Sequence, residues 1–314
     1  MTDYIKTMPQ RTAFGLALCD IARENDRLVV LDADVAPSTQ THLFKQEFPA
    51  RFFQCGIAEQ NMVGIAAGLS TQGWVPFASA FAVFLAHRAG DQIRNAIVHP
   101  RANVKLNGSY AGLPTGRAGA THSCVEDLAV MRALPGITIF DPADALEAML
   151  FTRLAVEMEG PVYLRTVRCN VPPVFGQGHR VELGKAVRMK DGGDLTVIST
   201  GMMTARALEA VNALEQQGVH ARLIHMPTVK PIDEDAILAA AETGLIVTVE
   251  NHSVIGGLGS AVCEVTAREQ PCRVMRCGYR DIFLESGDDE VLFDRYGLSA
   301  GAIAAQIRGA LGLK

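Results

Sequence analysis

The chain has 314 residues, of which 48% are hydrophobic and 20% charged, and this composition excludes a disordered or low-complexity protein. Its length is sufficient for two domains that each bury an apolar core. The formal net charge of −5 and the absence of a basic run argue against partners such as nucleic acid or a membrane surface.

Cysteine usage and hydropathy place the chain in a reducing compartment. The seven cysteines form an odd set without a Cys-x-x-Cys pair. No uninterrupted apolar run approaches the roughly 20 residues that span a bilayer. We therefore expect reduced thiols, no metal site within this chain and a cytoplasmic location.

The first half of the chain alternates helix and strand patterns in the manner of a parallel α/β sheet. Ligands bind such sheets at the carboxyl ends of the strands, so the segments that follow the strands are the candidate site. A helix is predicted over residues 11–24, and strands are predicted over residues 28–31, 51–54, 74–79, 103–107, 137–140 and 162–165.

Glu59 opens an otherwise apolar helical segment within residues 55–73. Taken alone, it is either a helix-start residue that interacts with the helix dipole or a carboxylate carried into the interior for a purpose. Asp34 and Ser38 follow the strand at 28–31, where capping and turn formation are an equally good explanation.

Two further stretches carry candidate side chains. Phe81, Phe84 and His87 have the spacing i, i+3, i+6 along one side of a helix, which by pattern alone favours core packing over a cofactor platform. The glycine-rich loop that ends at His122 can approach a ligand closely. Arg165 and Arg168 follow the last strand of this half at the same sheet edge.

The second half repeats the alternation on a smaller scale. Strands are predicted at 195–199, 221–224 and 245–249, with helices at 205–216 and 234–242 between them. The expected fold is therefore α/β, with one parallel-sheet domain at 1–170, a linker at 171–181 and a second parallel-sheet domain at 182–314. The glycines at 256, 257 and 259 resemble a dinucleotide fingerprint, but Val262 replaces its third glycine.

Taken together, these stretches resemble the C-terminal half of transketolase, and more closely the separately encoded C-terminal subunit of split transketolases. The resemblance covers nearly the whole chain, as a pyrimidine-binding domain followed by a transketolase C-terminal domain. Several motifs agree in order: Asp34-Val-Ala-Pro-Ser38, Gly56-Ile-Ala-Glu59-Gln, Phe81-x-x-Phe84, Ala120-Thr-His122, Leu164-Arg165, Thr228-Val-Lys-Pro-Ile-Asp233, Glu250-x-His252 and Gly256-Gly-Leu-Gly259.

The resemblance implies thiamine diphosphate as the cofactor and transfer of a two-carbon ketol unit from a ketose to an aldose. It makes Glu59 the carboxylate that bonds the cofactor's pyrimidine, and it puts the Phe84 ring against that pyrimidine, with Phe81 and His87 beside it. His122 then lies close to the reacting carbonyl, and Asp34 approaches the cofactor and substrate.

The same resemblance assigns the phosphate of the sugar to three separate segments, through Arg11, Ser38 and Arg165. The chain also departs from its relatives. Tyr110 replaces a substrate-facing histidine, and Arg117-Ala118 replace an acidic pair, which makes the pocket more positive by about three charges. We therefore expect an unusual ketose donor, such as a branched ketose phosphate of the apulose 4-phosphate type or a sulfonated ketose.

The family's Gly-Asp-Gly motif, which binds the diphosphate and its Mg²⁺, is missing from the sequence. The resemblance therefore implies a partner, an N-terminal transketolase subunit that supplies that half of the site, and an α₂β₂ assembly. Three alternatives stay open at this stage: the β subunit of a 2-oxo-acid dehydrogenase, a 1-deoxyxylulose-5-phosphate synthase, and a non-catalytic scaffold subunit.

Overall fold

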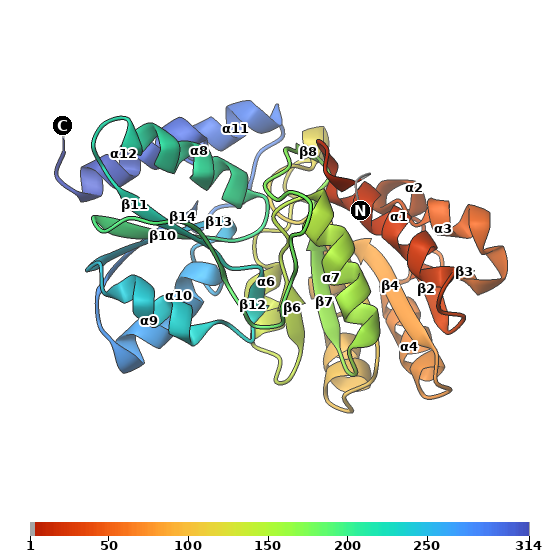
Figure 1. Cartoon of the computed structure of the whole chain (residues 1–314). Coiled ribbons are helices and arrows are strands. Elements are labelled where there is room, and N and C mark those ends of the chain that lie inside the picture. Colours follow the sequence, from red (N-terminus) through yellow and green to blue (C-terminus); the bar gives the residue numbers. More distant parts are fainter. Residues whose placement is uncertain (1–3, 314) are drawn as a thin grey trace.

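A computed structural model describes residues 4–313, which form two α/β/α sandwiches joined side by side (Figure 1). The first contains a seven-stranded sheet and the second a five-stranded sheet. The predicted fold class is confirmed, with one refinement: each sheet carries an antiparallel strand at one edge. Among residues 4–313, no helix combines the length and apolar character needed to cross a membrane.

The first sheet has the strand order β12-β6-β7-β5-β4-β2-β3. Its inner strands are buried, which explains the nearly continuous apolar sequences of β2 and β4, although β5 also buries Lys105 and Asn107. The strands are β2 (Leu28–Asp32), β3 (Phe52–Gln54), β4 (Val75–Phe81), β5 (Lys105–Ser109), β6 (Thr138–Phe140), β7 (Val162–Thr166) and β12 (Thr228–Lys230).

Helices cover both faces of this sheet. One face packs against α1 (Gln10–Ala22), α3 (His42–Glu47) and α7 (Ala145–Glu157), through a core that includes Phe14, Phe44 and Phe151. The other face packs against α4 (Glu59–Ser70), α6 (Asp127–Arg132) and two π-helical segments, η3 (Phe84–Arg88) and η4 (Ile93–Val98). The remaining short elements are α2 (Ala36–Thr39), η2 (Pro49–Arg51), α5 (Gly90–Gln92) and η5 (Gly116–Ala118).

The second sheet has the order β14-β13-β10-β11-β9, with α8, α11 and α12 on one face and α9 and α10 on the other (Figure 1). The strands are β9 (Val187–Lys190), β10 (Leu195–Ser199), β11 (Ala221–His225), β13 (Leu245–Ser253) and β14 (Arg273–Tyr279). The helices are α8 (Met203–Glu215), α9 (Glu234–Ala241), α10 (Leu258–Glu269), α11 (Asp289–Arg295) and α12 (Ala300–Ala310).

One strand pairing ties the halves of the chain together, and a second lies within the first half. β12 lies between β11 and α9 in the sequence, yet it joins the edge of the first sheet, where Thr228 pairs with Phe140. At the other end of the first half, β1 (Met8–Pro9) pairs with β8 (Asn170–Val171). The linker expected at 171–181 thus begins in a short strand, and the exact domain boundaries stay a prediction.

Candidate active site

The carboxyl edge of the first sheet gathers most of the residues that the sequence singled out. Asp34 and Ser38 follow β2, Phe81 is the last residue of β4, and Tyr110 comes directly after β5. These strands are parallel, so their carboxyl ends share one edge. Tyr110 adopts a positive φ of 60°, which turns the chain sharply as it leaves the sheet.

Glu59 is a buried carboxylate held by an arginine. It begins α4 and is 1% exposed. Nη1 of Arg88, at the end of η3, donates to both Glu59 oxygens at 2.9 Å. The Arg88 guanidinium carbon also lies 4.3 Å from the centroid of the Phe84 ring. The side chain of Arg88 itself is 45% exposed, so this guanidinium lies between the carboxylate and solvent.

A row of rings runs from Phe84 through Phe81 to Tyr110, which lies beside two arginines. The centroids of Phe81 and Phe84 are 5.5 Å apart, and those of Phe81 and Tyr110 are 4.2 Å apart, both stacked. His122 meets Phe81 and Phe84 edge-on at 5.7 and 5.6 Å. The expected grouping of Phe81, Phe84, Tyr110 and His122 is therefore present in the structure. Nδ1 of His122 lies 2.8 Å from the Thr121 hydroxyl, so the hydrogen bond fixes the ring and leaves Nε2 for a ligand.

In the described part of the chain, His87 and Asp34 make no contact with these rings and have other partners. Nε2 of His87 is 2.8 Å from a Glu126 oxygen, and the two side chains form, with Cys124, a group whose ligand atoms lie within 4.8 Å of one another. Burial raises the pKa of the Cys124 thiol well above its usual value, which opposes the thiolate that a metal ion needs. Asp34 is exposed and has a positive φ of 64°, with its backbone N–H bonded to Gln54.

The far end of the row is a cluster of positive charge. Nη1 of Arg11 donates to the backbone oxygen of Ser38 at 2.7 Å and to the Tyr110 hydroxyl at 3.0 Å. The guanidinium carbons of Arg11 and Arg168 lie 5.4 and 5.9 Å from the Tyr110 ring centroid. Nε of Arg11 is buried and has no hydrogen-bond acceptor in the described part of the chain.

Electrostatics at this cluster favour an anion. Burial lowers the pKa of Arg11, and the positive charge of Arg168 lowers it further, although Tyr110 acts in the opposite direction. Two arginines that repel each other around an unsatisfied N–H are a suitable site for a phosphate or sulfonate. Arg117, in η5, and Arg168 also line an open hollow of about 410 Å³ together with Gly287, Asp288 and Asp289.

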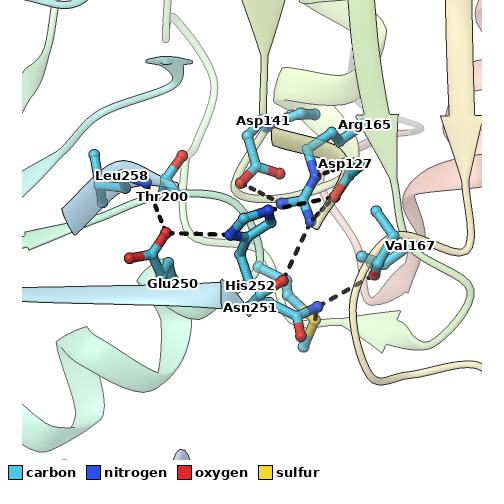
Figure 2. Close-up of polar contacts among 12 residues, drawn as sticks. Asp127, Asp141, Arg165, Val167, Thr200, Glu250, Asn251, His252 and Leu258 are labelled. Atoms are coloured by element: carbon cyan, nitrogen blue, oxygen red, sulfur yellow. Dashed lines mark hydrogen bonds and ion pairs between the residues drawn. The ribbon is translucent and has the colours of Figure 1, made fainter. Parts of the chain in front are cut away.

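Arg165 does not belong to this cluster, and its assignment to the anion site needs correction. Its side chain is 2% exposed and is engaged by two aspartates (Figure 2). Nε and Nη2 donate to Asp127 at 2.8 and 3.1 Å, and Nη1 donates to Asp141 at 2.9 Å. Because β7 alternates its side chains, Arg165 points with Tyr163 toward Asp127. The arginine beside Tyr110 is instead Arg168, just after the strand.

The Arg165 cluster continues across the contact between the two sheets (Figure 2). Nη2 of Arg165 also donates to the backbone oxygen of Asn251 at 3.2 Å. Nearby, Glu250 accepts the backbone N–H groups of Leu258 and Gly259 at the start of α10, at 2.6 and 2.9 Å. Burial raises the pKa of Glu250 to about 7 and lowers the pKa of His252 to about 4. The Glu250-x-His252 motif therefore lies in the buried contact between the halves of the chain.

Comparison with known proteins accounts for this arrangement. Two family models match, "Transketolase, pyrimidine binding domain" over residues 6–173 and "Transketolase, C-terminal domain" over residues 184–303. The chain belongs to the transketolase family. The match confirms the resemblance to a C-terminal transketolase subunit and the enzyme class that it implies.

Separately encoded subunits are among its relatives. The transketolase chain is 39% identical over 287 residues to the 6-deoxy-6-sulfo-D-fructose transketolase subunit SqwH of Clostridium sp., covering 91% of this chain and 89% of that protein. It is 38% identical over 295 residues to a subunit of the apulose-4-phosphate transketolase of Phocaeicola vulgatus, covering 95% and 94%. A solved structure titled "Split gene transketolase, inactive beta4 tetramer" has a TM-score of 0.89 and 47% identity, covering 98% and 99%.

No motif in the sequence points to Arg88, whereas Arg168 is expected at the ligand edge together with Arg165, without a role of its own. Arg88 lies four residues after Phe84, and this spacing on one helical face was a usable signal for its contact with the ring. Arg168 follows Arg165 at the same sheet edge, and the sequence offers no local feature that decides which of the two faces a ligand. The roles of the remaining candidates stay predictions.

Proposed function

We propose that this chain is the C-terminal subunit of a two-subunit transketolase that uses thiamine diphosphate to transfer a two-carbon ketol unit from an anionic ketose to an aldose. One observation carries the proposal. The buried Glu59 carboxylate, the Phe84 ring, His122 and the Arg11–Arg168 cluster form one continuous row at the carboxyl edge of the first sheet.

The residues at the Glu59 end fit an aminopyrimidine ring. Glu59 offers a buried acceptor, which favours a protonated ring nitrogen as its partner, and Phe84 offers a flat apolar face. When bound, thiamine diphosphate supplies the carbanion chemistry of the reaction. The protein's part is to hold a proton at the Glu59 carboxylate, to orient the ring and to exclude water. His122, fixed through Nδ1, can hydrogen-bond a substrate oxygen through Nε2.

The cationic end supports a donor that carries a terminal phosphate or sulfonate. Arg11 has an unsatisfied buried Nε, and Arg168 is close enough to depress the Arg11 pKa. Tyr110 and Arg117 replace a histidine and an acidic residue of the related subunits, so hydroxyl recognition along the sugar differs from that of the ordinary enzymes. The two relatives named for sulfofructose and apulose 4-phosphate make unusual ketoses the first candidates.

The sequence supports a requirement for a second subunit. The diphosphate and Mg²⁺ motif is missing from the sequence, and the similar solved structure is titled as an inactive β4 tetramer. We infer that an N-terminal subunit supplies the diphosphate and Mg²⁺ half of each site in an α₂β₂ assembly. Self-association of this chain alone would then give an inactive form.

The test is reconstitution with an N-terminal transketolase subunit, one that carries the Gly-Asp-Gly motif, from the same organism. The two chains are co-expressed, supplied with thiamine diphosphate and Mg²⁺, and screened with phosphorylated, sulfonated and neutral ketoses, with ribose 5-phosphate as acceptor. We expect ketol transfer from an anionic ketose by the complex and none by either chain alone. Activity of this chain alone would refute the shared site. Transfer of an acyl group from a 2-oxo acid to lipoamide would favour the dehydrogenase alternative, and inactivity of every complex would favour a scaffold.

A further inference from the structure

Arg88 contacts both of the side chains, Glu59 and Phe84, that the proposed function assigns to a pyrimidine ring. Its Nη1 donates to both oxygens of Glu59 at 2.9 Å. The same guanidinium lies over the Phe84 ring, with 4.3 Å between its central carbon and the ring centroid. A guanidinium is planar, and it donates hydrogen bonds at its edge while stacking through its face. A protonated aminopyrimidine has the same combination of properties.

We propose that Arg88 is an internal substitute for the cofactor. In the subunit without cofactor, the Arg88 guanidinium occupies the position of the pyrimidine ring. It must turn away from Glu59 before the cofactor can bind. The inference rests on the proposed function, because it takes Glu59 and Phe84 as the pyrimidine site. It assigns a function to a residue that contacts neither the anion cluster nor His122 in the contacts described for residues 4–313.

Burial explains why a substitute is useful. Glu59 is 1% exposed, and an ionised carboxylate without a partner at such a position is strongly unfavourable. Arg88 satisfies both oxygens until another donor arrives. The substitute can also leave easily, because its side chain is 45% exposed and lies at the end of η3, on the solvent side of the carboxylate. Its long aliphatic stem allows the head to turn into water without movement of the backbone.

Displacement has a measurable cost for cofactor binding. If only a fraction of the subunits has Arg88 turned away, the apparent affinity for the cofactor falls in proportion to that fraction. Removing the arginine should therefore tighten binding, although it removes a positive charge near a negatively charged cofactor. A residue that simply helped to bind the cofactor would have the opposite effect, since its loss would weaken binding.

The first experiment needs no cofactor. Thermal unfolding of this subunit alone is compared for wild type, Arg88→Ala, Glu59→Gln and the double variant. We expect Arg88→Ala to lower the melting temperature of the wild-type subunit by a few degrees. In the Glu59→Gln background the same substitution should lower it much less, because the neutral amide introduced there does not need a positively charged partner. Arg94→Ala is the matched control, since Arg94 is exposed and bonds only to Asn95 among the hydrogen bonds described. Additive effects of Arg88→Ala and Glu59→Gln would overturn the proposed pairing.

The second experiment measures thiamine diphosphate binding to the two-subunit complex by calorimetric titration in Mg²⁺ buffer. We expect Arg88→Ala to bind the cofactor about fivefold more tightly than wild type, as the loss of one partly exposed ion pair implies, and Arg94→Ala to match wild type. Equal or weaker binding by Arg88→Ala would overturn the inference. If the wild-type complex bound no cofactor at all, the proposed function would fail instead, and the cofactor-free experiment would still test the pairing.

Discussion

Glu59 is the side chain on which the proposed chemistry depends most directly. In the two-subunit complex, Glu59→Gln should lower kcat by about 10²–10⁴-fold, because an amide cannot hold the proton that the reaction needs at this position. The measurement is steady-state ketol transfer at saturating cofactor. Glu242→Gln, at an exposed position directly after α9 and far from this helix in the sequence, should keep wild-type activity. Full activity of the Glu59→Gln complex would exclude a catalytic role for the carboxylate.

Arg168 and Arg165 should behave very differently despite their proximity in sequence. Arg168→Ala should raise KM for an anionic ketose by about 10- to 100-fold, the effect of losing one charge-assisted hydrogen bond, and should leave a neutral ketose such as erythrulose nearly unaffected. Arg180→Ala, at an exposed arginine, is the control. An equal loss for charged and neutral ketoses would show that Arg168 does not bind the anion.

These two arginines show which parts of the candidate site the sequence can predict at the level of single residues. The first half of the site, Glu59 with Phe81, Phe84 and His122, could be grouped from ordered motifs. The choice between Arg165 and Arg168 could not, because it depends on the side of β7 that Arg165 faces and on Asp127 and Asp141, which come from other parts of the chain. The sequence alone does not distinguish a buried arginine that is paired with two carboxylates from an arginine that binds a ligand.

At the scale of elements, α4 presents an exposed face next to the proposed half-site. Ile65 is 38% exposed on this helix, and Ile57, just before it, is 75% exposed. A Cβ atom added at Gly64 meets nothing within 4 Å, so the helix backbone is open to close approach from outside. Since Glu59 begins the same helix, we infer that the partner subunit packs against this face.

A bulky residue at Gly64 should disturb assembly with the partner subunit without disturbing the folding of this chain. Gly64→Phe should leave the isolated chain folded, because the position is open and most residues are better helix formers than glycine. It should prevent stable association with the N-terminal subunit, as measured by size-exclusion chromatography of the mixed chains. Gly301→Phe, at an equally open position of α12, is the control and should assemble normally. Normal assembly of Gly64→Phe would place the interface elsewhere.

Local periodicity predicted most of the elements of the first sheet but not how the two halves join. The strands at 28–31, 137–140 and 162–165 appear within one or two residues of their expected bounds, since each is a continuous apolar run. The sequence marks β12 only as part of the motif Thr228 to Asp233, and no strand is predicted there. Its three residues form a strand only because the edge of β6 is available to them, and that is a tertiary contact.

At the scale of the whole molecule, a second buried polar cluster couples the halves, through Glu147. This residue of α7 lies 2.9 Å from Nε2 of His179 and 2.8 Å from Nε2 of His225, which belongs to β11 in the other sheet. Burial by itself raises the pKa of Glu147, but the charge of His225 and the hydrogen bonds from both histidines outweigh it and lower the pKa to about 2.

The lowered pKa makes the contact between the halves sensitive to acid. Glu147 binds a proton less readily in the folded chain than in the unfolded chain, so its contribution to stability is complete above its ordinary pKa near 4.5 and is lost as the pH falls toward 2. This lowering of the Glu147 pKa contributes about 3 kcal/mol to the free energy of unfolding at neutral pH. Glu147→Gln should therefore be less stable than wild type at neutral pH, and the difference should shrink below about pH 4.5.

Urea unfolding at a series of pH values, from neutral down to the lowest pH at which the chain stays folded, measures that difference. Glu157→Gln, at the exposed end of the same helix, is the matched control, and its curve should run parallel to wild type. A constant gap between the Glu147→Gln and wild-type curves would mean that the loss comes from packing and not from the carboxylate charge. A gap that closes with acid would show that one buried carboxylate, held by histidines from two other segments, helps to fix the second sheet against the first.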